Sequence, residues 1–207
     1  MSSYKVTYFN ITALGEPIRF LLSYGGQDFE DNRITLGKGK GGEQWEKLKP
    51  STPFGQMPLL EVDGKVAHQH LAICRYLGKK FGLVGDNDWE ALQIDTIADT
   101  VNDYRLKLVP TYWIDDEELK EKNYAEAIKT TIPFYLERIN DLAESGYLAN
   151  GKLSWADVHL AALLDYLSML TRFSIVDKYP NLKKVQNNVL ALPSIKAYLA
   201  KRPKTDF

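Results

Sequence analysis

The apolar pattern of this chain changes its period near Gly82, and that change limits the possible folds more than any other feature. Before Gly82, short alternating or continuous apolar runs lie between helical segments and indicate strands. After Gly82, apolar residues recur every three or four positions, which is typical of amphipathic helices. We therefore predict an α/β domain over residues 1–81, followed by an all-helical domain over residues 82–207.

The first domain has the predicted order β-α-β, a short helix, then β-β-α. The segments that indicate it are a strand at Lys5–Phe9, a helix at Glu16–Tyr24, a strand at Phe29–Ile34, a short helix around Trp45, a hairpin of Met57–Val62 and Lys65–Ala67, and a helix at Leu71–Leu77. The hairpin turn is Asp63-Gly64, a strong turn signal between two strand patterns. This order is that of the thioredoxin-like fold, in which helices pack on a small mixed sheet.

The second domain is predicted to be helical throughout. Trp89–Val109 has an apolar period close to 3.6 residues. A second long helix is expected at Tyr124–Glu144, where Pro133 is placed to kink or interrupt it. Ser154 and Asp157 precede an apolar run as a variant of the capping box. The short helices are expected at Leu182–Leu190 and Ser194–Lys201, after Pro180 and Pro193.

Charge and cysteine content exclude several classes of function. The 26 Lys and Arg residues nearly balance 27 Asp and Glu residues, which argues against a nucleic-acid or membrane-surface binder. No apolar run is long enough to span a bilayer, and the first residues show no signal-peptide pattern. The single cysteine, Cys74, excludes an internal disulfide, a CxxC pair and a cysteine-rich zinc site. We expect a reduced, soluble, cytoplasmic protein without a metal.

A glycine-rich segment matches a nucleotide-binding pattern only superficially. Gly37, Gly39 and Gly42 satisfy GxGxxG, and Glu61 follows about 20 residues later. A dinucleotide site needs this loop between a buried parallel strand and a long helix. Here the preceding strand is polar, any following helix must stop near Pro50, and Glu61 falls in the hairpin. We interpret the segment as a solvated loop.

Thioredoxin-like folds perform their chemistry where the first strand ends and the first helix begins. A thiol oxidoreductase would need cysteine there, and residues 9–15 contain none. Tyr8 is the side chain that this chain offers at that point. A lone tyrosine in a strand is more often part of the core than a catalyst, so position alone leaves both interpretations open.

Three further features are suited to a peptide ligand, and each has an ordinary alternative. A cis Met57-Pro58 bond would expose the Met57 backbone to an extended peptide, whereas a trans proline would simply open the strand. Gln69 and His70 begin a helix, whose N-terminus either binds a carboxylate or is capped. Trp45 and Lys49 lie four residues apart and either reach a carboxylate together or are a packed Trp beside a solvated Lys.

Together these features resemble the sigma class of glutathione S-transferases. The resemblance rests on Tyr8-Phe9, ALGEPIR at 13–19, PFGQMP at 53–58, Gln69 before AICRYL at 72–77, DTVNDYR at 99–105, GKLSWAD at 151–157 and KRP at 201–203. It covers essentially the whole chain. The class includes detoxifying transferases and glutathione-dependent prostaglandin D synthases, and it is related to lens crystallins that have largely lost activity.

The resemblance implies that the Tyr8 hydroxyl donates a hydrogen bond to the sulfur of reduced glutathione. A free thiol has a pKa near ~8.5, and a donor aimed at the thiolate lowers that pKa. Tyr8 would therefore act as a neutral phenol rather than as a base. No metal is implied.

The resemblance also implies a homodimer and the residues of two substrate sites. The glutathione-binding set is Tyr8, Trp45, Lys49, Gln56, Met57, Pro58, Gln69, His70 and Asp103, the last from the partner subunit, with Asn102 the less favoured alternative to it. The wall around the hydrophobic substrate would be Phe9, Ile11, Leu14, Arg105, His159, Leu163 and Phe207. For His159, simple packing within a helix is an equally weighted interpretation.

The chain departs from its family at three places. The family usually has serine where His70 stands, so we hypothesise weaker or more pH-dependent glutathione binding than in a His70→Ser variant, through a bulky or a protonated ring. The loop at 37–42 is longer than usual before Trp45, which affects the placement of that residue. Prostaglandin D synthases of the class tend to carry Arg at Leu14 and Trp near Pro110, so that isomerisation is less favoured.

The function expected from the sequence is conjugation of glutathione to hydrophobic electrophiles, with reactive aldehydes and lipid peroxides as related substrates. The first alternative is an inert or weakly active protein that binds glutathione or hydrophobic ligands, as a crystallin does. The second alternative is a glutathione-dependent prostaglandin D isomerase. A scaffold role in a larger translation complex is disfavoured because this sequence shows no additional domain.

Overall fold

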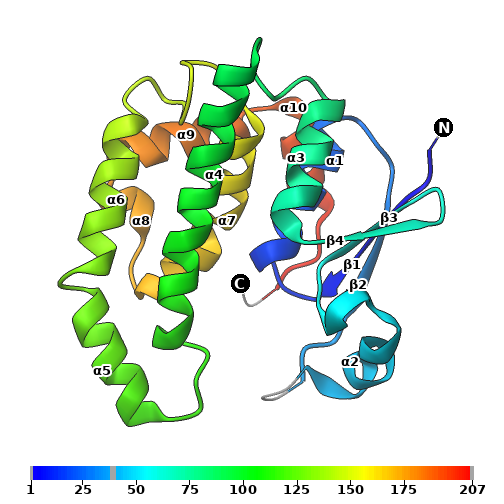
Figure 1. The fold of residues 1–207 in the computed structure, drawn as a ribbon, viewed down its shortest axis with the longest axis horizontal. Helices are drawn as coiled ribbons and strands as arrows, with labels where there is room; N and C mark the ends of the chain where they lie inside the picture. The colour runs from blue at the N-terminus through cyan, green and yellow to red at the C-terminus, as the bar shows by residue number, and fades with distance from the viewer. Residues whose placement is uncertain (1, 38–40, 206–207) are drawn as a thin grey trace.

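The first part of the chain forms a mixed sheet with helices packed on it (Figure 1). The structure is a computed structural model that describes residues 2–37 and 41–205. Its strands are β1 (Tyr4–Phe9), β2 (Glu30–Ile34), β3 (Leu59–Val62) and β4 (Lys65–His68), and its helices are α1 (Glu16–Tyr24), α2 (Gly42–Leu48) and α3 (His70–Lys80). The strand order is β2-β1-β3-β4, with β1 parallel to β2 and antiparallel to β3. The predicted thioredoxin-like arrangement is confirmed.

Local sequence explains where these elements stop. Asp63 and Gly64 both have positive φ, as a tight two-residue hairpin turn between β3 and β4 requires. Gly82 follows the C-cap of α3 with a φ of +73°, and the N–H of Leu83 donates to the carbonyl of Gly78 at 2.8 Å. This pairing is a Schellman motif, so Gly82 ends the helix as the sequence predicts. The domain boundary that we place there stays a proposal.

The rest of the described chain is helical, and α7 lies at its centre. The helices are α4 (Asp88–Leu108), α5 (Glu117–Ala127), α6 (Thr131–Leu142), α7 (Trp155–Thr171), α8 (Ile175–Lys178), α9 (Pro180–Leu190) and α10 (Pro193–Lys201). Helix α7 packs against α4, α8 and α9 on one side and against α1 and α3 on the other. It therefore joins the helical part to the sheet-bearing part, as its place between them in Figure 1 shows.

The capping box before α7 is confirmed. The Asp157 carboxylate accepts hydrogen bonds from the N–H and the hydroxyl of Ser154, both at 2.7 Å, and from the N–H of Leu148 at 2.7 Å. The segment expected as one helix at Tyr124–Glu144 belongs to two helices, because the helix is interrupted by a turn between Ala127 and Thr131. Pro133 stands in the first turn of α6, where a missing N–H costs no helical hydrogen bond.

The structure agrees with the rejection of a dinucleotide site at the glycine-rich segment. Strand β2, which precedes the segment, lies at the edge of the sheet. Helix α2, which follows it, has only 7 residues. Residues 38–40, including Gly39, lie outside the described residues.

Candidate functional site

Tyr8 is held in a fixed position where β1 turns toward α1. Its side chain is buried, and the backbone N–H of Leu14 donates to its oxygen. Its ring packs directly on Gly15, where an added Cβ would lie 2.5 Å from Cδ1 of Tyr8. Glycine is therefore required at residue 15 for close approach, although its φ of −79° suits any residue.

Burial keeps the Tyr8 phenol protonated. Desolvation raises the pKa of Tyr8 well above its ordinary value, and the nearby Tyr166 raises it further. The hydrogen bond from Leu14 and the charge of Arg105 lower this pKa, but burial is the larger effect. At neutral pH the side chain is therefore a hydrogen-bond donor, as the sequence analysis expects.

A first pocket, of about 460 Å³, opens in front of Tyr8. Phe9 lies between Tyr8 and Trp45, with both ring centroids 5.8 Å from its own and both contacts edge to face. Trp45 is buried, whereas Lys49 is exposed at the same pocket. The longer loop has not removed Trp45 from the site, because Gly41 packs against its ring.

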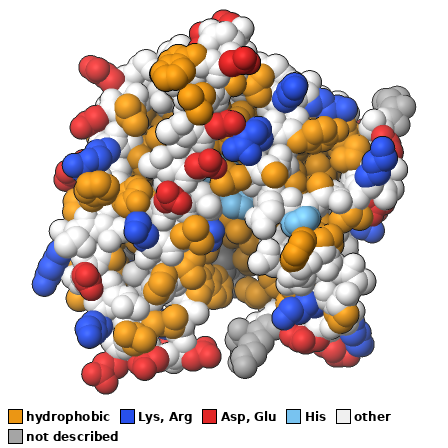
Figure 2. Space-filling view, viewed as in Figure 1, with side chains coloured by type: hydrophobic (Ala, Val, Ile, Leu, Met, Phe, Trp, Pro, Cys, Tyr) orange, Lys and Arg blue, Asp and Glu red, His pale blue; other side chains and the backbone are white. Residues whose placement is uncertain are grey.

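A second pocket, of about 400 Å³, collects the other predicted glutathione-binding residues. Its lining residues are Leu14, Gln56, Met57, Pro58, Gln69, His70, Asn102, Arg105 and Leu106. The Met57-Pro58 bond is cis, as the resemblance implies. Leu14 lines this pocket, and its backbone N–H donates to the oxygen of Tyr8, which lines the first pocket. The surface is hollowed between the helical part and the sheet-bearing part (Figure 2).

His70 is buried rather than presented to solvent. Its ring stacks on His159 of α7, with centroids 5.5 Å apart and 19° between the ring planes. Burial, assisted by the charge of Arg105, lowers the pKa of His70 to about 3. The hypothesis that a protonated His70 attracts glutathione is therefore wrong, because the ring is neutral between pH 6 and pH 8. The hypothesis of weaker binding than in a His70→Ser variant stays a prediction.

Three predicted residues do not line either pocket. His159 and Leu163 are fully buried in α7, so their role in the wall stays a prediction. Asp103 is exposed on α4, whereas its neighbour Asn102 lines the second pocket. Phe207 lies outside the described residues.

Two aromatic residues of the first pocket were missed by sequence reasoning. Trp113 and Tyr166 line it, and Nε1 of Trp113 donates to the Tyr166 hydroxyl at 3.0 Å. Tyr166 follows His159 by two helical turns, so helical periodicity could have identified it. Trp113 follows α4 in an irregular segment, where periodicity carries no signal.

Comparison with known proteins identifies the family. Residues 4–79 match the model described as "Glutathione S-transferase, N-terminal domain", and residues 102–202 match "Glutathione S-transferase, C-terminal domain". The chain belongs to the glutathione S-transferase family. It is 50% identical to a "Glutathione S-transferase" of Anopheles gambiae, over the whole of both chains. The resemblance stated from the sequence is confirmed.

Prostaglandin D synthases are also among the similar proteins. The chain is 36% identical to the "Hematopoietic prostaglandin D synthase" of Gallus gallus, over 99% of each chain. The solved "Structure of prostaglandin synthase D of Nilaparvata lugens" is 47% identical, with a TM-score of 0.91 over 98% of this chain and all of that one.

These findings make the chain a glutathione transferase, with glutathione as its co-substrate. Among residues 2–37 and 41–205, no group of three or more His, Cys, Asp or Glu side chains is placed to hold a metal ion. In the same residues, no helix has the length and apolarity needed to cross a membrane.

Replacing Gly15 by alanine tests whether the fixed position of Tyr8 matters. We expect kcat/KM for glutathione conjugation to fall at least about tenfold, because the new methyl group displaces the Tyr8 ring. Gly25→Ala is a matched control, since its Cβ would lie 2.3 Å from the Phe81 ring, which neither pocket includes. The control should lower thermal stability but leave kcat/KM unchanged. Equal loss of kcat/KM in both variants would contradict the role of Gly15.

The two buried histidines should make stability fall in acid. The pKa of His70 is lowered to about 3 and that of His159 well below its ordinary value, both mainly by burial. The unfolded chain protonates both rings below ~6.5, so the free energy of unfolding falls below that pH by up to about 1.4 kcal/mol per pH unit for each ring. Above about pH 7 neither ring contributes to the pH dependence.

Urea unfolding between pH 7.5 and 4.5 measures this effect. Below about pH 6.5 the free energy of unfolding should fall more steeply with decreasing pH in wild type than in His159→Leu. The two slopes should differ by ~1.4 kcal/mol per pH unit, which corresponds to one proton. Parallel pH profiles for the two proteins would contradict the burial of a neutral His159.

Proposed function

We propose that the enzyme conjugates reduced glutathione to small hydrophobic electrophiles, with Tyr8 donating its phenolic hydrogen to the glutathione thiolate. The observation that carries this proposal is the protonated Tyr8 phenol, which lines the first pocket and accepts a hydrogen bond from Leu14 of the second. A donor at that point favours the thiolate over the thiol, and each unit of lowered pKa corresponds to about 1.36 kcal/mol. We place the enzyme in the cytoplasm, where its single thiol would stay reduced.

The two pockets suit the two ends of glutathione. In the second pocket, Gln69 and His70 at the N-terminus of α3 would bind the γ-glutamyl carboxylate. Also there, Gln56 and Met57 with its cis Pro58 would hold the cysteinyl backbone. In the first pocket, Trp45 and the exposed Lys49 would hold the glycine carboxylate. This arrangement leaves the sulfur beside Tyr8.

The second substrate would lie over the sulfur against the remaining walls. Phe9 and Ile11 line the first pocket, and Leu14 and Arg105 line the second. Arg105 is close enough to Tyr8 to lower the pKa of the phenol, so its charge also favours an anion at the reacting sulfur. The same charge would stabilise an oxyanion on an aldehyde or a peroxide. His159, Leu163 and Phe207 are kept in the proposed wall.

A second candidate is glutathione-dependent prostaglandin D isomerisation. Trp113 favours this activity. Prostaglandin D synthases of the class tend to carry tryptophan near the position of Pro110, and here Trp113 supplies an indole in the wall of the first pocket instead. Leu14, where those synthases tend to carry arginine, disfavours it. An inert binding protein is the remaining alternative.

Turnover of several substrates separates these candidates. Wild type and Tyr8→Phe are assayed with glutathione and a chloronitrobenzene, an unsaturated aldehyde, a lipid peroxide, and a prostaglandin endoperoxide. We expect conjugation by wild type, and a loss of at least about a hundredfold in kcat/KM in Tyr8→Phe. If wild type turns over none of these substrates but is retained on glutathione resin, the inert binding protein is the correct interpretation.

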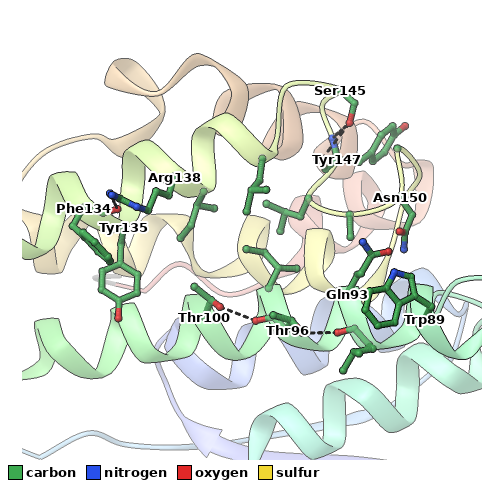
Figure 3. A pocket seen from close by; sticks show the side chains of 17 residues that line it. Trp89, Gln93, Thr96, Thr100, Phe134, Tyr135, Arg138, Ser145, Tyr147 and Asn150 are labelled. Carbon is green, nitrogen blue, oxygen red and sulfur yellow. Dashed lines mark hydrogen bonds between the residues drawn. The ribbon is translucent and has the colours of Figure 1, made fainter.

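We also propose a homodimer formed through the face that carries α4 and α6. This face exposes hydrophobic side chains (Figure 2), among them Trp89, Leu92 and Phe134, which are 68%, 52% and 52% exposed. They border an apolar groove of about 600 Å³ between α4 and α6 (Figure 3). Asp103 is exposed on the same helix α4. In a dimer formed through this face, Asp103 of one copy would reach the glutathione site of the other copy.

Light scattering after size exclusion tests the dimer. Wild type should have twice the chain mass of 23.6 kDa. Trp89→Glu/Phe134→Asp should be monomeric and bind glutathione more weakly, because each site loses Asp103 of the partner. Leu119→Asp is the control, since Leu119 is 45% exposed on α5 outside the groove. A dimeric double variant, or a monomeric wild type, would contradict the proposed face.

A further inference from the structure

Three nitrogen-bearing aromatic side chains lie in a row between α3 and α7. His70 stacks on His159 with 5.5 Å between centroids, and His159 meets the ring of Trp155 edge to face at 6.1 Å. The two helices approach closely behind this row, because a Cβ on Gly78 would lie 2.7 Å from Cβ of Trp155. The row therefore sits in a rigid contact between the sheet-bearing part and the helical part.

This row leaves four buried nitrogen atoms without hydrogen-bond partners among the described residues. They are Nε2 of His70, Nδ1 and Nε2 of His159, and Nε1 of Trp155. Buried polar atoms in native proteins are nearly always paired, and each exception needs an explanation. Among these four atoms, Nε2 of His70 belongs to the ring that also lines the second pocket.

The chemistry of the row favours an anionic ligand group over a cation. The Trp155 indole is a donor only, and each neutral imidazole carries one donor. Arg105 of α4 is the charged side chain that acts on both imidazoles, and its charge repels a cation. His70 also stands in the first turn of α3, where backbone N–H groups attract an anion.

Only His70 of this row reaches a pocket. It lines the second pocket, whereas His159 and Trp155 are fully buried behind it. A carboxylate in that pocket can therefore touch His70 but not His159. Any effect of His159 on such a ligand must pass through the His70 ring.

We infer that His159 is a positioning residue for glutathione: it stacks on His70 and holds that neutral ring so that it donates a hydrogen bond to the γ-glutamyl carboxylate. This inference rests on the proposed glutathione site. In this chain the imidazole takes the place of the serine hydroxyl usual in the family. A ring has more orientations than a hydroxyl, so it needs a second side chain to fix its plane. Trp155 supports His159 from the far side.

A double-mutant cycle on glutathione affinity tests the inference. Dissociation constants are measured by calorimetry for wild type, His159→Leu, His70→Ser and the double variant. With His70 present, His159→Leu should weaken glutathione binding roughly fivefold. In the His70→Ser background, His159→Leu should change the glutathione dissociation constant by less than about 1.5-fold, because the His70 ring through which His159 acts is absent.

Two further variants separate positioning from general stability. His159→Phe keeps a planar ring without nitrogen and should restore most of the affinity; it also replaces His159→Leu if the latter folds poorly. Leu170→Ala opens a cavity eleven residues further along α7 and should lower stability without changing the glutathione dissociation constant.

The outcomes also separate this inference from the proposed function. Equal weakening by His159→Leu in both backgrounds, no weakening at all, or equal weakening by Leu170→Ala overturns the positioning role. A wild type that binds glutathione and obeys the cycle but conjugates no electrophile overturns the proposed function alone. A wild type that binds no glutathione overturns both.

Discussion

Buried Arg19 organises the junction on which the candidate site depends. Its guanidinium donates to the carbonyl of Ile11 at 3.0 Å, to Glu16 at 3.1 Å and to Asp31 at 2.9 Å, which ties the turn after β1 to α1 and β2. Glu16, fully buried as well, accepts from Arg202 beyond α10 at 2.7 Å. One ionic cluster thus joins the first turn of the chain to its last helix.

The cluster matters for geometry more than for net stability. Burying charges is costly, and apolar replacements of buried ion pairs are often as stable. The bond from Arg19 to the Ile11 carbonyl, however, anchors the turn between Ile11 and Gly15 to this cluster. Leu14 and Gly15 in that turn hold the oxygen and the ring of Tyr8. The Tyr8 side chain is therefore positioned by the turn that the cluster anchors.

The role proposed for Tyr8 would explain how a chain with one cysteine performs thiol chemistry. Cys74 is fully buried, and burial raises the pKa of its thiol, so it is an inert core residue. The reactive sulfur has to arrive with glutathione, and the protein supplies a donor for it. In the proposed complex the two pockets hold the two ends of glutathione, and the electrophile lies over its sulfur.

Features encoded by neighbouring residues were predictable from the sequence, whereas long-range contacts were not. Gly82, the Asp63-Gly64 turn and the capping box at Ser154 each act within a few residues, so their patterns alone predict them. The sequence left open whether Pro133 kinks or interrupts one long helix; the helix is interrupted, and Pro133 stands in the first turn of α6. His70 and His159 stand 89 positions apart, and only the packing of α3 on α7 shows that they touch. The neutral state of His70 follows from that packing, so the sequence alone could not predict it either.

The central claim is that the protonated Tyr8 hydroxyl stabilises the thiolate of bound glutathione. The direct measurement is a pH titration of the ultraviolet absorbance of that thiolate in the complexes of wild type and Tyr8→Phe. The pKa of the bound thiol should lie well below ~8.5 in wild type and return toward that value in the variant. The same thiol pKa in both complexes would contradict the claim.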